Sequence, residues 1–448
     1  MRNLLKELTN HGICLFAFCI GSLACSAALD LGTLFAEKDA WTGKAEFFAV
    51  DHAKDGFAFA SEDRTIVNCL KHDTCTWYGN KVWEAKVYFD KGGEEEKVSR
   101  VELSLYNRGD AGLAVIDVAE LKAKIAAVAQ KLDASDKTKP EKTTLRNGGV
   151  QYRRRFDGAD PSGELAWGLS AADSNKNRTV EYLRLTLTPK GGAKAKPRGA
   201  LAKRATGKAG KAKIRDNVTK SPNGDVYIDN VPMVDQGQKG YCAAAVSERV
   251  LRYYGNAIDE HEIAQQAGTQ AQGGTSVAEM KKTVTAVGEK NGLGFQGIVS
   301  MSAGVGDLED EISRYNKAAK AEKKPELSLA QFTRGHTIYI SEMREAMDAK
   351  VIYRMRQKDA RLKKFSAGVR QQVNAGVPVF WGVTLGIYPE RGVNPQSVGG
   401  HMRLIIGYND KKKEILYTDT WGEGHELKRM PEDWAFAITH DAFFLKPR

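Results

Sequence analysis

The segment Gln236-Gly237-Gln238-Lys239-Gly240-Tyr241-Cys242, followed by the apolar residues Ala243 to Val246, organises the second half of this chain. Its two inner glycines indicate a tight loop, and the alanines that follow favour a helix. Cys242 would then open that helix, where unpaired backbone N–H groups and the helix dipole stabilise a thiolate. It is the only cysteine in the second half of the sequence. Two interpretations stay open at this point: a reactive nucleophile, or a buried cysteine that acts as a small hydrophobic residue.

A second segment, about 160 residues downstream, supplies the partners that a thiol nucleophile needs. His401 opens the apolar run Met402 to Tyr408, and a second run, Ile415 to Asp419, follows a polar turn. Two such runs predict an antiparallel hairpin. With the turn centred on residue 410, His401 and Asp419 would face each other directly, with Cβ atoms about 4.5–5.5 Å apart. The imidazole could then exchange a proton with the thiol while the carboxylate orients the ring.

These residues resemble the papain-like cysteine peptidases. Gln236 stands six residues before Cys242, as the family's glutamine stands before its nucleophile, and Asp419-Thr420-Trp421-Gly422 is similar to the family's Asn-Ser-Trp-Gly segment. The Gly-Gly-His sequence and the acidic third residue resemble most closely the bacterial branch that includes the double-glycine leader peptidases (peptidase C39-like). Ala243 departs from the plant and lysosomal members, which have tryptophan there. The resemblance covers about residues 225–300 and 365–425.

The resemblance implies an α+β peptidase domain in which a helix bearing Cys242 packs on an antiparallel sheet bearing His401 and Asp419. It implies that Cys242 is the nucleophile, His401 the acid/base and Asp419 the orienting group. Gln236 would donate its side-chain amide to the oxyanion, together with the Cys242 backbone N–H. Trp421 would shield the His–Asp pair from water or serve as an ordinary core residue. No cofactor or metal is implied.

The composition divides the 448 residues into four parts. Residues 1–27 are predicted to be a signal peptide, 28–190 an α+β domain, 191–222 a basic flexible linker, and 223–448 the peptidase domain with a helical insertion at about 300–365. In the N-terminal domain, period-two apolar patterns at 101–105 and 183–187 predict half-buried strands. The three- and four-residue spacing from Val118 to Leu132 predicts a helix. No catalytic set of residues is visible in that domain.

The first residues have the pattern of an export signal. Arg2 and Lys6 precede the apolar run Ile13 to Ile20, and small residues follow at 26–28. This pattern predicts a secreted or periplasmic protein that is cleaved near residue 27. Lipoprotein processing at Cys25 is the alternative, and it would give a cell-surface anchor. No later stretch is apolar enough to cross a bilayer.

The net charge of +11 is concentrated in the linker. Eleven Lys or Arg side chains and a single acid, Asp216, lie between Lys190 and Lys220. The basic charge therefore indicates a flexible tail-like segment and not a nucleic-acid-binding face. Because such a linker is exposed and rich in basic residues, it is expected to be a site of proteolytic cleavage. The N-terminal domain ahead of it is expected to be an inhibitory propeptide or a targeting module.

The remaining cysteines and histidines give weaker signals. Cys69 and Cys75 could close a small disulfide loop, or could join His72 in a metal site. His52 and His72 are isolated. Four other histidines lack partners at useful spacing in the sequence: His261, His336, His425 and His440. Of these, only His425 is expected near the site, on its rim.

The sequence thus predicts an exported cysteine endopeptidase that acts on a protein or peptide substrate through an acyl-thioester. A cell-wall peptide amidase or an acyl transferase with the same triad is the first alternative. A non-enzymatic interaction protein on a protease scaffold is the second.

Overall fold

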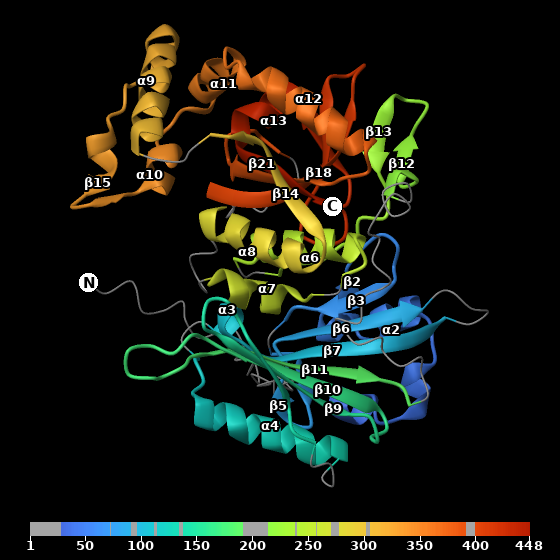
Figure 1. Cartoon of the computed structure of the whole chain (residues 1–448). Coiled ribbons are helices and arrows are strands. Elements are labelled where there is room, and N and C mark those ends of the chain that lie inside the picture. The colour runs from blue at the N-terminus through green and yellow to red at the C-terminus, as the bar shows by residue number, and fades with distance from the viewer. Residues whose placement is uncertain are drawn as a thin grey trace, which may run out of the picture.

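The computed structural model describes residues 28–71, 73–90, 96–111, 114–133, 138–190, 214–237, 240–256, 258–269, 277–301, 305–390 and 399–448. They form an N-terminal part and a C-terminal part that are stacked on each other (Figure 1). The predicted signal peptide, Cys25, His72, Gln238 and linker residues 191–213 lie outside the described residues.

The N-terminal part is built on an antiparallel sheet of eight strands in the order β2-β3-β6-β7-β11-β10-β9-β8. Their bounds are β2 Phe57–Phe59, β3 Ile66–Cys69, β6 Glu84–Asp90, β7 Lys97–Asn107, β11 Val180–Thr188, β10 Ser162–Leu169, β9 Val150–Phe156 and β8 Glu141–Thr144. A small sheet joins β1 Leu29–Asp30, β4 Cys75–Trp77 and β5 Asn80–Lys81. Short helical segments precede β2: α1 Leu31–Leu34, η1 Lys38–Trp41, α2 Ala45–Asp51 and η2 Ala53–Asp55. The helices α3 Arg108–Ala111 and α4 Val118–Asp133 follow β7.

The predicted strands and helix of this part are confirmed, with one correction. Leu183, Leu185 and Leu187 of β11 are buried in a core that α4 helps to form. Arg184 and Thr186 are buried as well, so the strand is not half-buried. The same holds for β7, in which Glu102 and Ser104 are buried. The polar face of the sheet is buried because α7 (Glu260–Ala267) of the C-terminal part packs against it, as Figure 1 shows.

The C-terminal part is built on a second antiparallel sheet of eight strands. Six run in the order β12-β13-β18-β17-β21-β14, and β19 and β20 continue from β18. Their bounds are β12 Val218–Lys220, β13 Asp225–Ile228, β18 Gly399–Asn409, β17 Val379–Leu385, β21 Thr439–Pro447, β14 Leu293–Ser300, β19 Glu414–Thr418 and β20 Lys428–Pro431. Strand β12 lies inside the 191–222 segment that the composition assigned to the linker. It belongs to the sheet because it pairs with β13.

Helices cover both faces of this sheet. In Figure 1, α6 Cys242–Tyr253, α7 Glu260–Ala267 and α8 Val277–Lys290 lie between the sheet and the N-terminal part. Helices α12 Arg361–Asn374 and α13 Glu432–Ile438 lie on the other side. Gly255, with φ of 81°, follows the C-cap residue Tyr254 and ends α6. The helix that bears Cys242 thus packs on the antiparallel sheet that bears His401.

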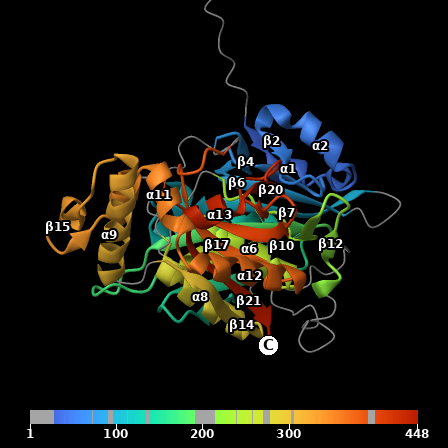
Figure 2. The ribbon, with the colours of Figure 1, turned by 90° about the horizontal axis from the view of Figure 1, so that it is seen from above.

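The helical insertion projects to one side of the sheet in both views (Figures 1 and 2). It has its own hydrophobic core, which includes Tyr315, Met343 and Val351. Its elements are α9 Val305–Glu322, η3 Leu329–Phe332, β15 Thr333–Arg334, β16 Thr337–Ile338, α10 Ile340–Glu345 and α11 Ala349–Gln357. Phe365 of α12 belongs to the hydrophobic core of the second sheet.

Cys69 and Cys75 are free and buried, with their sulfur atoms 4.0 Å apart, so the structure holds no disulfide between them.

None of the helices in the described part of the chain has both the length and the hydrophobicity needed to span a bilayer.

Candidate active site

The thiol of Cys242 sits in the first turn of α6, at the surface of the main core. Tyr241 is the N-cap residue, and its carbonyl accepts the first helical hydrogen bond from the N–H of Ala245, at 2.8 Å. Ala243 to Val246 are buried and fix this end of the helix against the sheet. Cys242 itself keeps partial exposure to solvent. The residue is therefore only partly covered, and its backbone is firmly held.

The surroundings of Cys242 favour the thiolate. Burial raises the pKa of the thiol, but the charge of His401 and a hydrogen bond from it outweigh burial, so the pKa lies below its ordinary value. The backbone N–H of Met402 adds a further hydrogen bond. A thiolate is the nucleophilic form of cysteine.

His401 lies on β18, opposite Val383 of β17, and is buried. Its Nε2 donates a hydrogen bond to Asp419 Oδ1, at 2.6 Å. Nδ1 is therefore the ring nitrogen that can exchange a proton with the sulfur of Cys242. Burial lowers the pKa of His401, but the carboxylate of Asp419 and the thiolate of Cys242 raise it more strongly, to about 9. The site thus favours a thiolate–imidazolium pair near neutral pH.

Asp419 follows directly after β19 and is fully buried. Oδ1 also accepts the N–H of Thr420, at 2.8 Å, and Oδ2 accepts the Nε–H of Arg403, at 2.7 Å. Burial raises the pKa of this carboxyl group, but the charges of His401 and Arg403 hold it well below its usual range. Asp419 is therefore ionised and can stabilise the imidazolium.

The predicted register of the hairpin is wrong. Residues 410–413 form the turn, Asn409 pairs with Glu414, and Leu404 pairs with Thr418. Continued by one residue, this register places Arg403 opposite Asp419, and His401 is a diagonal neighbour. A four-residue turn and an irregularity near Gly407 account for the shift. His401 and Asp419 still meet, because side chains two residues apart on a strand point to the same face.

Gln236 lies beside the loop that follows Asp419. Its backbone N–H donates to the carbonyl of Thr420, at 2.9 Å. Its Oε1 accepts the hydroxyl hydrogen of Thr420, at 2.5 Å. This bond fixes the orientation of the Gln236 amide. Gly237 makes the turn after it with φ of 64°, in the left-handed region that glycine favours.

Two buried arginines that the sequence reasoning missed hold the acid in place. Arg403 also binds Glu390 Oε1, at 2.7 Å. Arg249 of α6 donates to the carbonyl of Asp419 and to Thr418 Oγ1, which ties the helix that begins at Cys242 to the loop of Asp419. Burial lowers the pKa of Arg249 to about 10. A charged residue inside the apolar run of β18 was the available signal for Arg403.

Trp421 covers one face of the imidazole. Its ring stacks on His401, with centroids 4.6 Å apart and an interplanar angle of 16°. His425 makes an edge contact with Trp421, with ring centroids 5.5 Å apart. Its carbonyl accepts the N–H of Asp419, at 2.9 Å, and so closes the 419–425 loop.

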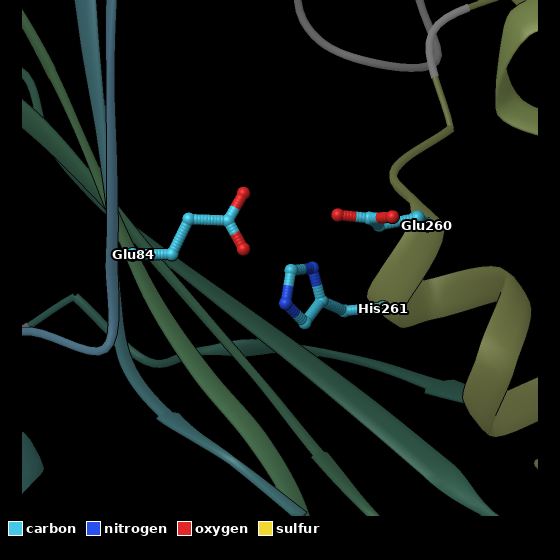
Figure 3. A group of neighbouring side chains, drawn as sticks. All are labelled: Glu84, Glu260 and His261. Atoms are coloured by element: carbon cyan, nitrogen blue, oxygen red, sulfur yellow. The ribbon is translucent and has the colours of Figure 1, made fainter. Parts of the chain in front are cut away.

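One group of described residues has the chemistry of metal ligands. Glu84, Glu260 and His261 bring ligand atoms within 4.8 Å of one another (Figure 3). The ammonium of Lys86 lies 2.6 Å from Glu84 Oε1 and 3.3 Å from Glu260 Oε1, so a cation already balances these carboxylates. The group is therefore interpreted as part of an ion-pair network.

The expectation that the remaining histidines lack partners is wrong for two of them. His261 Nδ1 lies 2.8 Å from Asp259 Oδ1. His440 contacts Thr384 and Arg344, and burial lowers its pKa well below the usual value. The partner of His261 is close in sequence, whereas the two partners of His440 come from distant segments.

Comparison with known proteins relates the C-terminal part to a family of peptidases. Residues 228–440 match the Peptidase_C39 like family. The C-terminal part is a papain-like, C39-like cysteine peptidase domain. The matched segment of this peptidase domain contains Gln236, Cys242, His401 and Asp419.

Two solved structures are similar to the chain, with low sequence identity and low TM-scores. The peptidase domain of Streptococcus ComA, described as a bifunctional ABC transporter involved in a quorum sensing pathway, is 13% identical, with a TM-score of 0.25. That match covers 49% of this chain and 100% of the other. Xylellain, a cysteine protease from Xylella fastidiosa, is 14% identical over 54% of this chain and 90% of its own, with a TM-score of 0.26. No curated protein matches the chain.

Proposed function

We propose that this protein is an exported cysteine endopeptidase that hydrolyses peptide bonds in proteins or peptides through Cys242, His401 and Asp419. The observation that carries the proposal is the hydrogen-bonded series from Cys242 through His401 to Asp419, in which the thiol pKa is lowered and the imidazole pKa is raised. The family match supplies the reaction class.

In the first half-reaction, the thiolate of Cys242 adds to the carbonyl carbon of the scissile bond, and the carbonyl π electrons move to oxygen. The side-chain amide of Gln236 and the backbone N–H of Cys242 stabilise this oxyanion. When the C=O bond re-forms, the C–N bond breaks, and His401 gives its Nδ1 proton to the leaving amine. The product is an acyl-thioester and a free amine.

In the second half-reaction, neutral His401 takes a proton from water as the oxygen adds to the thioester carbonyl. The C–S bond then breaks, which releases the carboxylic acid and restores the thiolate–imidazolium pair. Asp419 accepts the Nε2–H throughout and stabilises the ring when it is charged. Trp421 keeps water from one face of the ring.

Export is proposed from the signal-like pattern of residues 1–27, with a lipid anchor at Cys25 as the alternative. Expression of the full chain with its native start, followed by N-terminal sequencing of the product and its cell fraction, tests this. A mature end near residue 28 outside the cytoplasm supports export. An intact Met1 in the cytoplasm contradicts it.

The reaction is tested with purified full chain against three substrate classes: an unstructured protein, a cell-wall peptide, and an acyl donor with an amine acceptor. Peptide bond cleavage in the protein, lost in Cys242→Ala, supports the proposal. Turnover of the cell-wall peptide or of the acceptor alone would instead favour the amidase or the transferase.

A further inference from the structure

The N-terminal part is attached to the peptidase domain through a buried set of ion pairs on α7. Arg184 of β11 lies 2.7 Å from Asp259 Oδ2 and 3.1 Å from Glu262 Oε1. Arg153 of β9 binds the same Glu262, at 2.7 Å. With Lys86 and Glu260, these contacts match three acids at the start of α7 with bases from the N-terminal sheet. Figure 3 shows Glu260 on α7, facing the N-terminal strand that carries Glu84. Removal of the sheet would take these three bases away from the acids of α7.

A second set of contacts at this interface is made of amides. Gln265 of α7 accepts from Gln151 Nε2, at 3.0 Å, and donates to the carbonyl of Leu169, at 2.7 Å. Asn147 Nδ2 donates to the carbonyl of Gln265, at 3.0 Å. Gly168 is in close approach here, since a Cβ on it would lie 2.5 Å from Gln265 Oε1. The two surfaces are therefore fitted to each other in shape as well as in charge.

One contact of the N-terminal part reaches the residue that precedes the nucleophile. The hydroxyl of Tyr241 donates to Asn107 Oδ1, at 2.9 Å, and both residues are buried. The Tyr241 ring also lies against the backbone of Gly109, where a Cβ would come within 2.8 Å of it. Because Tyr241 is the N-cap residue of α6, its side chain fixes the start of the helix that presents Cys242.

The N-terminal part also contacts the other loops of the site. The N–H of Glu62 donates to Glu426 Oε1, at 2.9 Å. Asn68 binds the carboxyl of Asp235, which in turn accepts the N–H of Gly237, at 3.0 Å. These contacts reach the segments on either side of the triad, yet Cys242 stays partly exposed.

We infer that the N-terminal domain is a permanent part of the active enzyme, which positions Cys242 through the Asn107–Tyr241 hydrogen bond. This inference rests on the proposed role of Cys242 as the nucleophile. It differs from both expected roles of this domain, since an inhibitor would cover the sulfur and be released, and a targeting module would not hold the active-site helix.

The first test separates positioning from general stability in the full chain. Tyr241→Phe removes only the hydroxyl, and Asn107→Ala removes its acceptor. Asn147→Ala is the matched control, because it removes an amide from the same interface at α7. The measurements are kcat, KM and the rate of Cys242 alkylation by iodoacetamide across pH, with the modified residue identified by mass spectrometry.

Tyr241→Phe and Asn107→Ala are expected to lower kcat about tenfold or more with little change in KM, since small displacements of a reacting group are costly. Both should also slow alkylation of Cys242 near neutral pH. The double variant should be no worse than either single variant, and Asn147→Ala should behave as wild type. Wild-type kcat and alkylation in Tyr241→Phe and Asn107→Ala would overturn the inference, as would an equal loss in Asn147→Ala.

The second test cuts the chain between the two domains. A site for a sequence-specific protease is placed within residues 191–213, and the purified full chain is cleaved there. Both halves are expected to elute together in size-exclusion chromatography and to retain activity. Release of the N-terminal half with equal or higher activity in the other half would overturn the inference. If the intact chain cleaves no peptide, the proposed function fails, while co-elution and alkylation still test the docking and the positioning.

Discussion

His401 reaches Asp419 along a diagonal of the β18–β19 hairpin, with Nε2 2.6 Å from Oδ1. Arg403, which lies across from Asp419 in the same register, binds the other carboxylate oxygen at 2.7 Å. The carboxylate therefore orients the imidazole with one oxygen and is itself held by a guanidinium through the other. Arg403 thereby influences the orientation of the imidazole through Asp419.

Asp419→Asn should move the alkaline limb of the pH–rate profile. The imidazolium of His401 is needed for the ion pair, so activity is lost as pH rises through its pKa of about 9. Without the carboxylate charge that pKa falls, and the limb of kcat/KM should shift to lower pH by about one unit or more. Asp441→Asn is the control, a buried acid of the same sheet that pairs with Lys281. An unchanged limb in Asp419→Asn would contradict the assigned role.

Cys242→Ala should abolish turnover, with a loss of about 10⁶-fold because the other triad members cannot act without the nucleophile. The fold should persist, since only one half-buried sulfur is removed, and circular dichroism can check this. In the wild type, iodoacetamide should modify Cys242 faster than a free thiol near neutral pH. Cys75→Ala is the matched control and should keep full turnover. Residual turnover in Cys242→Ala within tenfold of wild type would exclude this cysteine.

Gln236→Ala should lower kcat by about 10²–10³, the usual cost of one oxyanion donor, and leave KM nearly unchanged. Thr420→Val should give a smaller loss, because it removes the hydroxyl that fixes the Gln236 amide and leaves the amide present. Steady-state kinetics on one peptide substrate measure both. A loss below tenfold in Gln236→Ala would rule out its role, and Gln238 would be the next candidate.

Arg403→Met should destabilise the peptidase domain by about 3–5 kcal/mol, because it leaves the buried carboxylates of Asp419 and Glu390 without their shared cation. Urea unfolding of the full chain measures the change. Arg334→Met is the control: that arginine pairs with Glu342 on the exposed surface of the insertion, so its loss should be undetectable. Equal midpoints for Arg403→Met and wild type would refute the proposed support of Asp419.

Oxidation should join Cys69 and Cys75. Their sulfur atoms lie 4.0 Å apart, and a disulfide needs about 2.05 Å, so a small approach of β3 and β4 suffices. Protein treated with oxidised glutathione should lose the thiols of Cys69 and Cys75 and show their two peptides linked by mass spectrometry. In Cys69→Ala no such linked pair can form, and none should appear. Two free thiols at 69 and 75 after oxidation would contradict this expectation.

Much of the site could be predicted from local sequence. The glycine loop and the alanines after Cys242 predict a helix start, and the apolar runs around residue 410 predict a hairpin, because both signals depend on neighbouring residues. The register was wrong by two residues or more, since the turn length and the irregularity near Gly407 are not visible as apolar periodicity. An even shift leaves the facing side chains on one surface, so the pairing of His401 with Asp419 did not depend on the exact register.

The roles of Arg249 and Arg403 could not be predicted in the same way. Arg403 is a single charge in an apolar segment, whereas Arg249 stands beside Glu248. The partners of both arginines come from distant segments: Arg249 on α6 binds the 418–419 segment, and Arg403 binds Glu390. The polar residues of β7 and β11 similarly indicated a solvated face. Their burial depends on α7, which lies about 80 residues or more further along the chain.

The sequence by itself determined the reactive residue types and their order, because helix starts, turns and strand periodicity arise from short-range sterics and hydrogen bonding. Only the tertiary structure decided how Asp419 is held, what stacks on His401, and which domain fixes Tyr241. Those relationships join residues that are far apart in the chain, and burial and charge pairing between separate elements select them. The position of Cys242 is thus set locally by its loop and helix, and its surroundings are set by contacts across the whole fold.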